Sequence, residues 1–143
     1  MEGFVKFFSG GLMSLKTLMV WFGVFSCLLV LAGTIFSFFG FSFFPPAILP
    51  KNVLLPWESA IFGSVLIGWG VTLFFLGRLA FRRNDGELMK ILLLGIVVWL
   101  VIDSAFSIYL GVFSNVVLNF AILVFSGFPL IKSIRKIEGK AKK

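Results

Sequence analysis

Two acidic residues, Glu58 and Asp103, lie within long apolar segments of this sequence. A carboxylate near the centre of a membrane-spanning helix costs at least about 2.5 kcal/mol on insertion scales, so each one needs a compensating partner or a function. The sequence contains no histidine, and its one cysteine, Cys27, excludes an internal disulfide and paired-cysteine redox or metal sites. We therefore predict no metal, no cofactor and no catalytic residue, and we look to the carboxylates for binding.

Several polar residues are placed to join Asp103 on one side of a helical protein. Trp99 and Ser107 lie four residues before and after it, which puts all three on one helix face. Asn115 and Asn119 lie one turn apart in the next apolar segment. Because successive spans alternate in direction, these groups all fall in the outer half of the membrane, together with a carboxylate at the start of an earlier span. We predict a ligand-binding pocket lined by Glu58, Trp99, Asp103, Ser107, Asn115 and Asn119.

Simpler interpretations of the same residues remain open. Glu58 follows Pro56 and Trp57 in the first turn of its helix, where the helix dipole favours an anion. The other polar groups could only hydrogen-bond neighbouring helices, at about 0.6 kcal/mol each. Aspartate performs that structural task less often than asparagine or serine, so Asp103 is the residue that favours a binding site.

The elements that position these residues are four long apolar segments. The chain has 143 residues, of which 59% are hydrophobic and 13% charged, a composition that excludes an ordinary soluble domain. Spans are predicted at 17–39, 57–81, 88–109 and 113–131, each near the about 20 residues that cross a hydrocarbon core. We predict an all-α fold: one membrane domain, 1–143, forming a four-transmembrane-helix antiparallel bundle.

The basic residues predict the orientation of the spans. Of the 13 Lys and Arg residues, all but Lys51 fall on one side of a four-span arrangement, which places both termini in the cytoplasm. The net charge of +7 therefore reflects topology and contact with anionic membrane lipids, and no nucleic acid partner is predicted. The predicted location is a cell membrane, most simply the inner membrane of a bacterium.

The segments between and beyond the spans differ in character. The connection 40–56 is rich in Phe, Leu and Pro, and we predict that it caps the outer mouth of the bundle. Residues 1–16 alternate apolar residues with lysines, which is typical of a helix lying on the inner surface. A disordered segment or a continuous extension of the first span is equally compatible with this pattern. Residues 132–143 are predicted to be a basic cytoplasmic tail.

One helix face carries small residues. Ala60, Ser64, Gly68 and Thr72 recur at every fourth position of the second span, which predicts a flat ridge for close packing. The neighbour on that ridge is either another span of the chain or a second copy, giving a homo-oligomer.

Three functions follow from these observations. The leading hypothesis is a binding protein for a lipid or hydrophobic small molecule, with its polar end held in the outer-leaflet pocket. The second is an assembly subunit of a membrane complex or homo-oligomer. The third is a proton- or ion-coupled transporter or membrane-embedded enzyme that uses Glu58 and Asp103. No motif identifies a known family.

Overall fold

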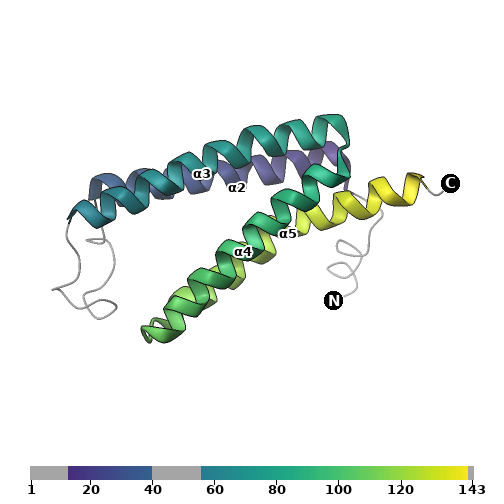
Figure 1. Cartoon of the computed structure of the whole chain (residues 1–143). Coiled ribbons are helices and arrows are strands. Elements are labelled where there is room, and N and C mark those ends of the chain that lie inside the picture. Colours follow the sequence, from purple (N-terminus) through teal and green to yellow (C-terminus); the bar gives the residue numbers. More distant parts are fainter. Residues whose placement is uncertain (1–12, 40–55, 142–143) are drawn as a thin grey trace, which may run out of the picture. The chain divides into compact units, whose positions relative to one another are not determined.

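The computed structural model describes residues 13–39 and 56–141, and these residues form four long helices. They are α2 (Leu15–Phe39), α3 (Pro56–Arg83), α4 (Gly86–Tyr109) and α5 (Phe113–Ala141) (Figure 1). The prediction of an all-α protein with four long apolar helices is confirmed. The predicted cap and most of the predicted surface helix fall on 40–55 and 1–12, outside the described residues.

The helices extend beyond the predicted spans. Most of the added residues lie at the helix ends that the Lys and Arg distribution predicts to be cytoplasmic. The largest difference concerns 132–143, which were predicted to be a tail, whereas α5 continues to Ala141. Pro129 lies inside this helix, and the Ser133 hydroxyl donates a hydrogen bond of 2.7 Å to the Pro129 carbonyl.

Two tight turns connect the last three helices. Between α3 and α4, Asn84 adopts a positive φ of 52°, and Asp85 caps α4 by accepting a hydrogen bond of 2.9 Å from the Leu88 amide. Between α4 and α5, Gly111 has a φ of 74°, a conformation that glycine adopts without strain. This second turn makes α4 and α5 an antiparallel hairpin, visible as the green and yellow pair in Figure 1.

The chain divides into two compact units, one of Met1–Gly23 with Leu76–Lys143 and the other of Val24–Phe75. In the second unit, α2 and α3 approach so closely that a Cβ on Gly33 would lie 2.6 Å from the Gly63 carbonyl oxygen. A Cβ on Gly70 would lie 3.0 Å from the Ser26 carbonyl oxygen. Glycine therefore permits backbone-to-backbone packing of these two helices.

The first unit contains the α4–α5 hairpin together with the start of α2 and the end of α3. Gly77 on α3 leaves room for the ring of Phe22 on α2, which is almost fully buried. Trp21 packs its ring between Phe125 and Phe128 of α5, with centroid distances of 5.3 and 5.2 Å. Aromatic packing therefore joins the start of α2 to α5 in this unit.

The small residues that contact α2 are not those of the predicted ridge. Ser64, Gly68 and Thr72 are exposed, and a Cβ on Gly68 would meet nothing within 4 Å. The contact with α2 is made by the face that carries Gly63 and Gly70. The reason is steric, because α2 approaches the α3 backbone more closely than an Ala, Ser or Thr side chain allows. A second copy on the ridge Ala60, Ser64, Gly68 and Thr72 stays a prediction.

The surface of the helices is apolar. Large exposed side chains occur on every helix, for example Val20 on α2, Val65 on α3, Ile91 on α4 and Phe120 on α5. Soluble monomers rarely expose apolar area on this scale, whereas lipid covers it without cost. All four helices are long and apolar enough to cross a membrane.

Candidate polar site in the α4–α5 hairpin

The centre of the candidate site is the carboxylate of Asp103 on α4. Its Oδ2 accepts hydrogen bonds from Nδ2 of Asn115 and from Nδ2 of Asn119, each 2.6 Å long. The two asparagines lie one turn apart on α5, so their amides reach the same oxygen. A carboxylate oxygen has two lone pairs, so it can accept both hydrogen bonds at once.

Two serines of α4 complete the cluster. The Ser107 hydroxyl donates to the Asp103 backbone carbonyl at 2.7 Å and accepts from Asn115 Nδ2 at 2.8 Å. The Ser104 hydroxyl accepts from Asn119 Nδ2 at 3.0 Å. Ser104 is not among the predicted site residues, because the prediction rested on positions four residues from Asp103. The signal was its spacing of three from Ser107, which places both hydroxyls toward the same neighbouring helix.

The hydrogen bonds of the cluster leave acceptors unused. A primary amide has two N–H donors, and Asn115 and Asn119 each use both, one on Asp103 and one on a serine. By contrast, Oδ1 of Asp103 and the amide oxygens of both asparagines have no hydrogen-bond partner among the described residues. The open capacity of the cluster is therefore to accept hydrogen bonds.

Burial varies across the cluster. Asn119 and Ser107 are buried, with 3% and 7% of their surface exposed, whereas Asp103, Ser104 and Asn115 are half-buried. Asp103 is therefore not enclosed as completely as its partner Asn119. It lies at the margin of the contact between α4 and α5, so part of its side chain is accessible to the surroundings.

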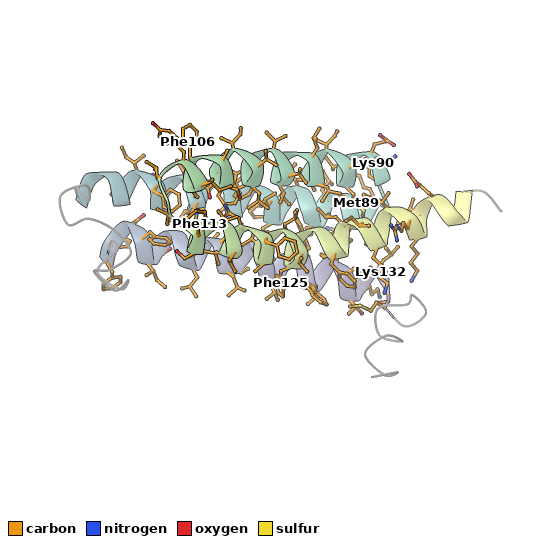
Figure 2. The ribbon with its side chains drawn as sticks, turned by 90° about the horizontal axis from the view of Figure 1, so that it is seen from below. Met89, Lys90, Phe106, Phe113, Phe125 and Lys132 are labelled. Carbon is orange, nitrogen blue, oxygen red and sulfur yellow. The ribbon has the colours of Figure 1, made fainter. Side chains whose placement is uncertain are left out.

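The cluster lies at one end of the hairpin. Asp103 precedes the end of α4 at Tyr109 by about six residues, or about 9 Å at the helical rise of about 1.5 Å per residue. Figure 2 shows Phe106 and Phe113 near this end, and Lys90 and Lys132 toward the other. The polar cluster and the basic side chains of the hairpin therefore occupy opposite ends.

Not every predicted site residue joins the cluster. Trp99 is half-buried one turn further from the hairpin turn than Asp103. Glu58 lies in the first turn of α3, but its side chain is outside the described residues, and α3 there belongs to the other unit. The pocket formed with Glu58 and the 40–56 connection stays a prediction.

These features define the class of the protein, which is a small polytopic membrane protein with four candidate transmembrane helices. Comparison with protein-family models, with curated proteins and with solved structures found no match. The function therefore has to be argued from the cluster around Asp103.

Proposed function

We propose that this protein binds a lipid or another hydrophobic small molecule beside the α4–α5 hairpin, with Asp103 and Asn119 orienting its polar end. One observation carries the proposal. Oδ2 of Asp103 accepts two hydrogen bonds from the protein, whereas Oδ1 has no partner among the described residues. An acceptor of this kind within an apolar helix is available to a molecule dissolved in the membrane.

The cost of a carboxylate favours binding over simple adhesion. Hydroxyl and amide groups join membrane helices at about 0.6 kcal/mol each, and they carry no charge into the hydrocarbon. An aspartate costs several times more to insert, and here half of its acceptor capacity is not used to join the helices. Its partial exposure gives a ligand from the bilayer access to the unused oxygen.

The proposal includes an orientation in the membrane. With both termini in the cytoplasm, as the Lys and Arg distribution predicts, the turn at Gly111 faces outward and the cluster lies in the outer leaflet of a bacterial inner membrane. The 40–56 connection would then cover it. Labelling single cysteines at Gly111 and Asn84 with an impermeant thiol reagent, in a Cys27→Ser background, tests this. If the cysteine at position 84 is labelled in intact cells, the protein has the opposite orientation to the one proposed.

Ligand binding is tested on the purified full-length protein. Native mass spectrometry and lipid extraction should reveal a co-purified molecule, and adding that molecule back should raise the unfolding temperature. Asp103→Asn and Asn119→Ala should reduce this stabilisation. Ser126→Ala is the matched control, because Ser126 is buried on α5 and, among the described residues, its hydroxyl bonds only to the Ile122 carbonyl. If nothing co-purifies and a lipid panel stabilises all variants equally, the proposal fails.

A second candidate function is assembly through the ridge on α3. It is favoured by the exposure of Ser64, Gly68 and Thr72, whose small side chains leave α3 accessible to another helix. Ser64→Cys and Gly68→Cys variants in a Cys27→Ser background should then crosslink as dimers in native membranes. Monomers at both positions would exclude self-association through this face. Transport or acid–base chemistry by Glu58 and Asp103 stays a prediction from the sequence.

A further inference from the structure

We infer that the group recognised at Asp103 is a primary ammonium, the cationic end of an amphiphilic amine or aminophospholipid. This inference rests on the proposed function and specifies its ligand class. Its basis is the set of open atoms in the cluster, which consists of Oδ1 of Asp103 and the amide oxygens of Asn115 and Asn119. All three accept hydrogen bonds, and one belongs to an anion.

The donors of the cluster are almost entirely used within it. Both N–H groups of each asparagine are engaged, and the Ser107 hydroxyl donates to a backbone carbonyl. Only the hydroxyl hydrogen of Ser104 has no assigned acceptor among the described residues. A ligand that accepts hydrogen bonds, such as a carbonyl compound, has one donor available in the cluster. A ligand that donates hydrogen bonds has three unused acceptor atoms available.

The charge of the cluster excludes anionic headgroups. The basic residues of the hairpin lie toward its other end, and Lys90 is about 13 residues from Asp103, or about 20 Å along α4 (Figure 2). A phosphate or carboxylate beside Asp103 would meet a like charge, and no basic side chain of the described part of the hairpin lies near it. A cation meets an opposite charge in a low-dielectric setting, where the attraction is strong.

The charge of a headgroup and its number of hydrogen-bond donors together determine how well it should bind. A primary ammonium carries a positive charge and N–H donors, so it can both pair with Asp103 and donate to the unused Oδ1. A quaternary ammonium has the charge but no donor, and an alcohol has a donor but no charge. The expected order of binding is therefore primary ammonium first, then alcohol and quaternary ammonium, with sulfate last.

The inference is tested with four amphiphiles that share one chain: dodecylammonium, dodecyltrimethylammonium, dodecanol and dodecyl sulfate. The full-length protein is placed in phosphatidylcholine nanodiscs, whose headgroup has no N–H, and the unfolding temperature is titrated with each probe. A parallel arm replaces part of the phosphatidylcholine with phosphatidylethanolamine, which separates a lipid source of the ammonium from a free amine. We expect dodecylammonium to stabilise the protein most.

Asp103→Asn should weaken dodecylammonium binding about tenfold or more, because hydrogen bonds to charged groups are stronger than neutral ones. Asp85→Asn is the matched control, since asparagine also caps helices and Asp85 lies at the other end of α4. The inference is overturned if another probe stabilises the wild-type protein as strongly as dodecylammonium does, a comparison that needs no variant. It is also overturned if Asp103→Asn keeps the preference for dodecylammonium. If no probe and no co-purified lipid binds, the proposed function itself fails.

Discussion

The two antiparallel helix pairs solve the problem of association in lipid by different means. Between α2 and α3, glycines bring backbones into contact, as at Gly33 and Gly63, and no charged group lies in that contact in the described part of the chain. Between α4 and α5, a carboxylate accepts from two amides, and two hydroxyls complete the network. The first contact depends on shape, and the second depends on polar pairing.

The difference indicates that the α4–α5 hairpin contains polar groups beyond those needed to hold its two helices together. The α2–α3 contact shows that this chain can join helices through glycine and aromatic packing, at no cost in buried charge. The network at Asp103 adds an ionisable group and leaves three acceptors open. The comparison therefore supports a binding role for the polar contact, and four predictions can break or sharpen it.

The largest effect is expected at Gly63. In Gly63→Ala the new Cβ would overlap Ser37 and the Gly33 carbonyl, so the helices must separate. Overpacking of this kind typically costs about 1–3 kcal/mol. Gly68→Ala, on the exposed face of the same helix, should change the free energy of unfolding by less than about 0.5 kcal/mol. Unfolding in mixed micelles measures both, and equal stabilities would show that α2 and α3 do not pack through glycine.

The next effect is expected at Asp103. Asp103→Ala removes two hydrogen bonds and leaves the amides of Asn115 and Asn119 without their acceptor. With the strength that hydrogen bonds have between membrane helices, this should lower the free energy of unfolding by roughly 1–2 kcal/mol. Ser126→Ala should cost less, because in the described part of the chain the Ser126 hydroxyl bonds only within α5. If Asp103→Ala is as stable as the wild type, the polar network does not hold the hairpin together and the contrast with α2–α3 weakens.

The sequence predicted the helices because lipid imposes a simple rule: about 20 apolar residues must be helical to satisfy their backbone. It also brought Asp103, Ser107, Asn115 and Asn119 to one place, since periodicity and antiparallel direction determine which faces meet. The choice of the α3 face that packs on α2 could not be predicted. The α3 faces that carry Gly63 and Gly68 both have small side chains, and only the shape of the neighbouring helix determines which face it packs on.

A smaller effect is expected when single asparagines are removed. Asn119 is buried and Asn115 is half-buried, although both donate to Asp103 at the same distance. Asn119→Ala should therefore destabilise the protein more than Asn115→Ala, with the larger cost about 1 kcal/mol. Thermal unfolding of the pair measures this order. The reverse order would mean that burial does not set the strength of these bonds, and that Asn115 is the principal partner of Asp103.

The smallest effect is expected at Lys90, at the end of the hairpin opposite the polar cluster. Its Nζ lies 2.8 Å from Glu87 Oε1 and 2.9 Å from Glu138 Oε1, and all three side chains are 45% or more exposed. Salt screens such exposed pairs, so Lys90→Gln should speed amide exchange in the last turns of α5 at low salt and match the wild type at high salt. Lys16→Gln is the control, since Lys16 pairs with no carboxylate among the described residues. If Lys90→Gln instead lowers the unfolding temperature as much as Asp103→Ala, the hairpin depends equally on its exposed ion pairs, and the polar cluster has no special place in it.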